Sequence, residues 1–452
     1  MTDSSNAAPR VPKRVAAVIL NSLKGGVVPR IGLPYITVGR ETEIRALLTD
    51  LSLIADGGAS FRFLVGRYGA GKSFLLQTIR THAMGEGFVV ADADLSPERR
   101  LQGGQGQGLA TYRELIRNLS TKTRPEGGAL NLILDRWVAS TLDIRAGEAD
   151  DADNVDDAES LMRAQLDELE EMVHGFDFAR MLVRYRTATL EGDDEAKSCV
   201  TRWMRGEYRT KTEAKADLGT STIITDDDWY DYVKLLARFL VGAGYNGLIV
   251  MIDELVNLYK IPNAITRQYN YEKILTMYND TLQGKAHHLG IIMGGTPTSI
   301  EDRRRGVFSY EALRSRLTQG RFAREDMRDM LAPIIRLHPL TYEELLVLIE
   351  KLGQIHAGYF GYEDTITDED LAAFLQIEFG RVGADTHLTP REVIRDFIEL
   401  LDIAYQNPDV DIAALLRDEG AIAGASMPAA QSNATNSDSG DAGAAPFAEF
   451  TL

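Results

Sequence analysis

The feature that most constrains the fold of this chain is the octapeptide at residues 66–73, which reads GRYGAGKS. It matches the phosphate-binding loop pattern G-x-x-x-x-G-K-[ST], whose glycines let successive backbone N–H groups point at phosphate oxygens. An apolar strand candidate at residues 61–65 precedes the loop, and a helical pattern at residues 73–84 follows it. This order predicts a nucleoside triphosphate site at the edge of a sheet.

The positions of this loop have expected partners on the nucleotide. Lys72 is placed to neutralise the β- and γ-phosphates, and the hydroxyl of Ser73 can ligate Mg²⁺. ATP and Mg²⁺ are therefore the expected ligands. The expected cofactor-binding residues in and next to the loop are Gly66, Tyr68, Gly69, Ala70, Gly71, Lys72, Ser73 and Phe74.

A second strand candidate, at residues 248–252, ends in the adjacent carboxylates Asp253 and Glu254. Open α/β sheets bind ligands at the carboxyl ends of their strands, so these side chains are expected beside the loop. We expect Asp253 to hold Mg²⁺ through water and Glu254 to act as the base that polarises the attacking water. Together with the loop, the pair predicts an ATPase rather than a protein that only stores nucleotide.

Short apolar runs at residues 61–65, 88–91, 248–252 and 289–293 alternate with helical patterns. Fully apolar strands of this length indicate a parallel sheet covered by helices on both faces. The predicted fold class is α/β: a P-loop NTPase with a parallel sheet, a large helical insertion and an all-helical C-terminal lid.

Composition and pattern divide the chain into five expected parts. These are a flexible lead at residues 1–14, a nucleotide-binding core at 15–108 and 241–335, a mainly helical insertion at 109–240, a helical lid at 336–422, and a disordered tail at 423–452. Helices alone are expected from Pro339 onward.

The net charge of −18 is unevenly distributed. The stretch at residues 148–171 holds eleven acidic residues and one basic residue, and we expect it to form a solvated loop or helix ends. The net charge therefore does not exclude a local basic groove elsewhere, and Arg-rich segments at 303–305 and 180–215 leave direct DNA contact open. No helix-turn-helix pattern is present, so sequence-specific readout is not predicted.

The number of cysteines and the hydropathy pattern restrict the expected environment of the chain. Cys199 is the single cysteine, which excludes an internal disulfide framework and fits a reducing compartment. No apolar run reaches the length needed to cross a bilayer, and the seven histidines lack metal-ligand spacing. A cytoplasmic protein without membrane contact is expected.

Several other polar residues lie after a predicted strand or at the start of a predicted helix. Thr296 follows the apolar run at 289–293, and Arg314 and Arg316 lie just beyond it. Arg391 opens a helical pattern in the predicted lid, and the tetrapeptide VGRE at residues 38–41 precedes another helical pattern.

Taken in order with the loop and the two carboxylates, these residues resemble the AAA+ ATPase superfamily, nearest its origin-recognition/Cdc6-like and STAND-like branches. The resemblance implies that Thr296 orients the attacking water and that Arg391 folds back on the phosphates. It also implies that Arg314 or Arg316 reaches the γ-phosphate bound by a neighbouring subunit, so a homo-oligomer is expected.

Three segments, at residues 26–33, 66–74 and 93–96, are more narrowly similar to the BrxD family, the ATP-binding proteins of BREX-type phage-defence systems. The resemblance spans roughly residues 13–420. It implies other defence-system proteins as partners, and it places the adenine contacts at Val28, Pro29, Val38, Gly39 and Arg40. Two alternatives stay open: a nucleotide-gated binding or signalling module with little turnover, and a DNA-associated loader or translocase.

Overall fold

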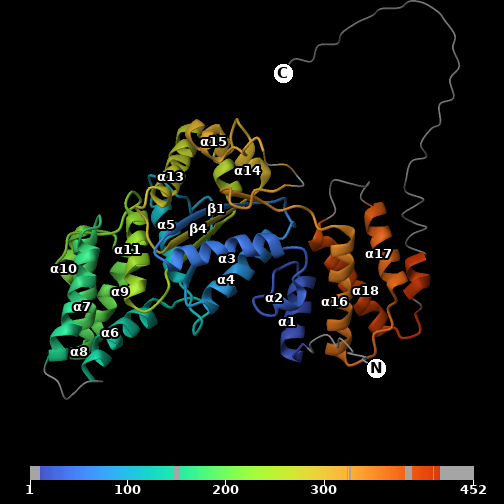
Figure 1. Cartoon of the computed structure of the whole chain (residues 1–452), viewed down its shortest axis with the longest axis horizontal. Helices are drawn as coiled ribbons and strands as arrows, with labels where there is room; N and C mark the ends of the chain where they lie inside the picture. The colour runs from blue at the N-terminus through green and yellow to red at the C-terminus, as the bar shows by residue number, and fades with distance from the viewer. Residues whose placement is uncertain are drawn as a thin grey trace, which may run out of the picture.

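The computed structural model describes residues 11–146, 153–322, 324, 327–381, 389–410 and 412–417. The predicted disordered tail at 423–452 lies outside these residues, as does the predicted flexible lead up to residue 10. A central sheet lies between a group of helices from the middle of the chain and a group formed by its C-terminal helices (Figure 1). Within the described ranges, no helix is long and apolar enough to cross a membrane.

The centre of the molecule is a five-stranded parallel sheet with the strand order β2-β3-β4-β1-β5. Its strands are β1 (Ala59–Val65), β2 (Val89–Asp94), β3 (Leu248–Asp253), β4 (Leu289–Gly295) and β5 (Ile334–Arg336). The predicted α/β class is confirmed, and each of the four apolar runs overlaps one of the strands. Strand β5 was not predicted, because three residues are too few to carry a periodic pattern.

Alternate side chains of the strands enter two different hydrophobic cores, as the period of a strand requires. Leu64 and Ile249 pack on one face of the sheet with helices α3 (Glu41–Ala55) and α4 (Lys72–Gly85). Phe63, one residue before Leu64, packs into the core on the other face. Both faces of the sheet are therefore covered, and the ligand can approach only at a strand end.

The second face of the sheet is covered by the long segment between β2 and β3 and by α13 (Ala264–Leu282). This segment forms α5 (Gln107–Arg117), α6 (Leu130–Ala146), α7 (Asp153–Glu170), α8 (Gly175–Glu191), α9 (Asp194–Met204), α10 (Lys211–Leu218) and α11 (Trp229–Gly242). Its buried Trp137, Trp203 and Trp229 belong to the same continuous core as the strands. The helices of the segment thus extend the core of the sheet.

Over Asp153–Glu170 the acidic stretch forms helix α7 rather than the expected solvated loop or helix ends, and residues 148–152 of the stretch lie outside the described residues. Leu166 and Leu169, three residues apart, are buried, whereas Asp167, Glu168 and Glu170 are exposed. This is the pattern of an amphipathic helix. The high local charge obscured its apolar positions in the sequence.

Four short helices follow β3 and β4: α12 (Val256–Tyr259), α14 (Pro297–Glu301), the 3₁₀ helix η1 (Val307–Ser309) and α15 (Glu311–Leu317). After β5 the chain forms α16 (Tyr342–Phe360), α17 (Asp368–Arg381) and α18 (Pro390–Gln406). The first helices of the chain, α1 (Lys13–Lys24) and α2 (Leu33–Ile36), complete the set. Helix α1 begins at Lys13, so its first two residues fall within the predicted flexible lead.

The first and last helices of the chain share a third hydrophobic core, separate from the two cores of the sheet. Ile19 and Leu20 of α1 pack there with Ile349 of α16 and Phe397 of α18. In Figure 1, α1 and α2 lie beside α16 accordingly. We call α1, α2, α16, α17 and α18 the terminal helix group.

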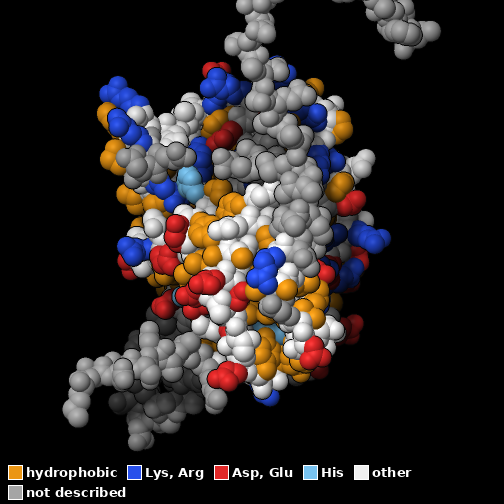
Figure 2. All heavy atoms as spheres, turned by 90° about the vertical axis from the view of Figure 1, so that its right-hand side faces the viewer, with side chains coloured by type: hydrophobic (Ala, Val, Ile, Leu, Met, Phe, Trp, Pro, Cys, Tyr) orange, Lys and Arg blue, Asp and Glu red, His pale blue; other side chains and the backbone are white. Residues whose placement is uncertain are grey.

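The outer face of the terminal helix group is mixed in character. Figure 2 shows hydrophobic side chains scattered among Asp and Glu side chains there. Phe360 and Tyr405 are two of the exposed hydrophobic residues, and their ring centroids are 4.4 Å apart, so each covers part of the other. Scattered exposed apolar residues of this kind are ordinary on soluble surfaces.

Candidate functional site

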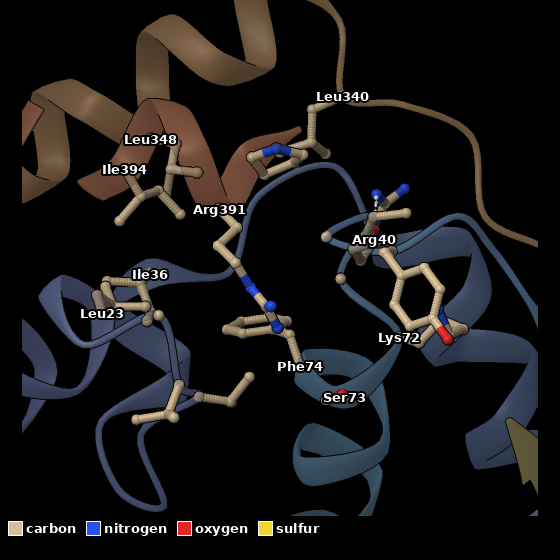
Figure 3. A pocket seen from close by; sticks show the side chains of 18 of the residues that line it. Leu23, Ile36, Arg40, Lys72, Ser73, Phe74, Leu340, Leu348, Arg391 and Ile394 are labelled. Atoms are coloured by element: carbon tan, nitrogen blue, oxygen red, sulfur yellow. Dashed lines mark hydrogen bonds between the residues drawn. The ribbon is translucent and has the colours of Figure 1, made fainter. Parts of the chain in front are cut away.

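A cavity that is partly open to solvent lies between the phosphate-binding loop and the terminal helix group (Figure 3). The loop and the start of α4 form one wall, and the carboxyl end of β3 contributes two carboxylates. The predicted residues that line the cavity are Val28, Val38, Arg40, Tyr68, Gly69, Ala70, Gly71, Lys72, Ser73, Phe74, Asp253, Glu254 and Arg391. The predicted residues outside its lining are Pro29, Gly39, Gly66, Thr296, Arg314 and Arg316.

Lys72 closes the phosphate-binding loop on itself. Its Nζ donates hydrogen bonds to the carbonyl oxygens of Gly66, at 2.9 Å, and Arg67, at 3.0 Å. Burial lowers the pKa of Lys72, whereas the negative charges of Asp253 and Glu254 raise it. The Lys72 ammonium group is thus bonded to loop carbonyl oxygens and is influenced by two nearby carboxylates. It lines the cavity where the phosphates of a nucleotide are expected.

Two glycines give the loop its shape. Gly69 and Gly71 have φ angles of 76° and 92°, which side-chain-bearing residues rarely adopt. A Cβ at Gly69 would also lie 2.7 Å from the Oγ1 of Thr389, the residue that caps α18. The loop is therefore in direct contact with the start of α18.

The two carboxylates at the end of β3 are held by a local turn. Glu254 has a φ of 63°, in the left-handed region, and its N–H donates to Asp253 Oδ1 at 2.8 Å. Non-glycine residues in this region are uncommon and concentrate at functional sites. The bond fixes the Asp253 carboxylate at the sheet edge.

Two residues that sequence reasoning missed adjoin this turn. Asp94, the last residue of β2, lies in register with Asp253, and loss of hydration together with the charges of Asp253 and Glu254 raises the pKa of Asp94. Gly294 of β4 packs against the same carboxylate, since a Cβ there would lie 2.1 Å from Asp253 Oδ1. Neither has a motif of its own; the pairing of the strands brings them to Asp253.

The terminal helix group supplies the opposite wall of the cavity. Figure 3 shows the Arg391 side chain extending from α18 toward Phe74, and a Cβ at Gly26 would lie 3.8 Å from Arg391 Cδ. Apart from the predicted Val28, the rest of this wall is formed by apolar residues of these helices and of the segments next to them, and these were not predicted as site residues from the sequence. They include Leu23, Val27, Ile36, Leu340, Leu348 and Ile394.

Arg40 is buried, with 5% of its surface exposed. Its Nη2 donates to the carbonyl oxygen of Ala70 in the loop, at 3.1 Å, and to that of His338, at 3.0 Å. The guanidinium is thus bonded to backbone on two sides.

Thr296 and the arginine pair lie outside the cavity lining. Thr296 is the N-cap of α14, where its hydroxyl accepts a hydrogen bond from the Ser299 N–H at 3.2 Å. Arg314 pairs with Glu311 on α15, and Arg316 donates to a carbonyl of its own helix. Their roles toward a nucleotide remain predictions.

The family comparison covers most of the chain. A family model described as "BREX system ATP-binding protein BrxC/D" matches residues 11–420. No curated protein matches the chain. The matched range includes the loop, the carboxylates at the end of β3 and the whole terminal helix group.

Proposed function

Because the chain belongs to the BrxC/D family of BREX system ATP-binding proteins, we propose that it binds ATP in this cavity and hydrolyses it as a homo-oligomer. An ATP-binding role in a phage-defence system follows from the family itself. We further propose that hydrolysis requires Mg²⁺ and takes place in a homo-oligomer. We also propose that the chain acts with other defence-system proteins and that it belongs to the AAA+ superfamily.

This proposal rests on the kinds of residue that line one cavity. Lys72 and the other loop residues line it from the sheet side, Arg391 enters it from α18, and an apolar wall lies beside them. Loop amides and cations suit a triphosphate, and the apolar wall suits a purine ring. We place adenine against Val28 and Val38.

Mg²⁺ fits the donors present. The hydroxyl of Ser73 and the carboxylate of Asp253 are hard oxygen ligands lining the same cavity, and the ion would offset charge on the phosphates. Among the described residues, no three His, Cys, Asp or Glu side chains form a group that could hold a metal ion. Ser73 and Asp253 would supply two of the ligands, and nucleotide phosphates would supply others, as Mg²⁺ sites commonly use them.

Glu254 is the proposed general base. It lines the cavity next to Asp253, and a carboxylate so placed can accept a proton from the attacking water. Thr296 is the proposed water-orienting residue, because its hydroxyl keeps its own hydrogen after accepting the bond from Ser299.

A complementation experiment tests hydrolysis in an oligomer. A chain with Arg314 and Arg316 both replaced by Ala, and a chain with Glu254→Gln, should each be nearly inactive alone, since a trans arginine contributes about 10³–10⁵ in rate. Mixed in equal amounts, they should regain activity at about a quarter of the interfaces, where an intact base meets an intact arginine. Phosphate release measured against mixing ratio gives the result.

Two outcomes would contradict the trans arginine. One is a mixture no more active than its components; the other is a wild-type rate per chain that stays constant on dilution to monomers. The matched control is a mixture of two samples of the Glu254→Gln chain, which should stay inactive.

Gly294→Ala should reduce ATP turnover by about 100-fold, because a displacement near 1 Å at reacting groups has effects of that size. The added Cβ would lie 2.1 Å from Asp253 Oδ1, so the carboxylate must move. Gly85→Ala, at the end of α4, is the control, since its Cβ would meet nothing within 4 Å. Equal turnover in the two variants would argue against a role for the Asp253 position.

A further inference from the structure

Two short segments join the terminal helix group to the sheet. The first linker, residues 37–40, runs from α2 to α3, and the second linker, residues 337–341, runs from β5 to α16. Val38 of the first linker and Leu340 of the second line the same cavity. Any movement of the terminal helix group relative to the loop must therefore be accommodated by these two linkers.

The first linker is held closely against α16. Lys351 Nζ donates to the carbonyl oxygen of Thr37 at 3.1 Å. Gly39 has a φ of 66°, and a Cβ there would lie 2.4 Å from the Glu344 carboxyl group. The first linker is thus bonded to α16 at Thr37 and lies against it at Gly39, the residue before Arg40.

Arg40 connects three parts of the chain through a single nitrogen. It belongs to the first linker, and its Nη2 bonds the Ala70 carbonyl of the phosphate-binding loop and the His338 carbonyl of the second linker. The two hydrogens of Nη2 are accounted for by these two acceptors.

The charge of Arg40 is retained despite burial. Burial lowers the pKa of its guanidinium, whereas Glu43 and Glu344 raise it, and arginine stays protonated in proteins. Hydrogen bonds from a charged donor are stronger than neutral ones, so the two bonds to backbone carbonyls are strong ties.

We propose that Arg40 is a positioning residue that fixes the phosphate-binding loop to both linkers, rather than a contact to adenine. This inference rests on the proposed ATP site. Ala70 lies in the middle of the loop, so a tie at its carbonyl sets the direction of the neighbouring loop amides. Through these two hydrogen bonds, a change in the position of the loop would also move the second linker, which leads into α16.

Loss of Arg40 should therefore affect how the protein binds phosphates and should not depend on the base of the ligand. Without the guanidinium, the Ala70 carbonyl loses its partner and the loop amides lose their fixed direction. Affinity for any ligand carrying the triphosphate group should fall by the same factor, with or without the base. An adenine contact predicts the opposite, a loss confined to ligands with the base.

The experiment uses the full chain with Arg40→Met, Arg40→Lys and Arg80→Met. Arg80 is the matched control: it is 6% exposed and its Nη2 bonds Ser120 Oγ and the Pro125 carbonyl, away from the cavity. Affinities for Mg·ATP and for inorganic tripolyphosphate are measured by displacement of a fluorescent ATP analogue. Amide hydrogen exchange is measured on each protein without nucleotide.

Arg40→Met should weaken ATP and tripolyphosphate equally, by about tenfold, which corresponds to about 1.4 kcal/mol. It should also speed amide exchange in both the loop and the second linker. Arg40→Lys keeps a charged donor on a shorter side chain and should recover part of both effects. Arg80→Met should leave both affinities unchanged and speed exchange only around residues 118–126.

Two results would overturn the inference: a loss of ATP affinity with unchanged tripolyphosphate affinity, or unchanged exchange in the loop and second linker of Arg40→Met. If that variant does not fold, Arg40→Lys decides by the same two measurements. A wild-type chain that does not bind ATP would refute the proposed function instead, and the exchange data would still decide whether Arg40 ties the loop to the linkers.

Discussion

Lys72→Met should lower the affinity for Mg·ATP by about 100-fold, the largest effect on binding expected from any single side chain here. Among the residues that the structure describes, Lys72 is the one lysine that lines the cavity, and its Nζ donates to two carbonyl oxygens of the loop. Methionine keeps much of the apolar stem and removes the charge. Isothermal titration of the full chain with Mg·ATP measures the loss.

Lys234→Met is the matched control for this prediction. Lys234 has a side chain only 13% exposed and pairs with Asp231 and Asp280, each at 2.9 Å, on the far side of the sheet from α4. Its loss should lower the stability of the protein, measured by thermal unfolding, and leave ATP affinity as it was. If Lys72→Met bound ATP as tightly as this control, the phosphate site would have to lie elsewhere.

Glu254→Gln should slow ATP turnover by about 10²–10⁴-fold, the range that a general base contributes. Glutamine has nearly the same shape, so the turn at φ 63° and the bond from its N–H to Asp253 can persist. ATP affinity should therefore change little. Phosphate release under multiple turnover and titration with Mg·ATP separate the two quantities.

Glu301→Gln serves as the control for the base. Glu301 lies on α14, outside the cavity lining, and pairs with Arg336 at 2.7 Å. Its turnover should match that of the wild type. A wild-type protein that binds ATP but scarcely turns it over, with Glu254→Gln no different, would favour the nucleotide-gated module over the ATPase.

The proposed phosphate half of the candidate site was predictable because its residues are local in the sequence. Lys72 and Ser73 belong to one octapeptide, and Asp253 and Glu254 directly follow an apolar strand. The parallel order of the strands brings both to one edge of the sheet, and all four residues line one cavity. The family resemblance stated from the sequence is confirmed by the match over residues 11–420.

Of the apolar half of the site, only Val28 and Val38 were expected, through the family resemblance; the rest was not predictable, because it depends on packing between distant segments. Leu23 and Ile394 look like ordinary positions of amphipathic helices, and only the packing of α1 against α18 brings them to one cavity. Asp94 and Gly294 became site residues through strand pairing with β3. Long-range contacts of this kind leave no local pattern in a single sequence.

The shared core of α1 and the last helices also sets the order in which the protein can mature. Lys24 of α1 pairs with Asp402 of α18, and the two residues are 378 positions apart. At usual rates of synthesis, α1 leaves the ribosome roughly 20–75 s before α18 exists. During that interval Ile19 and Leu20 lack the partners that α18 supplies, among them Phe397, so the terminal helix group and the cavity wall that it forms are complete only after α18 has been made.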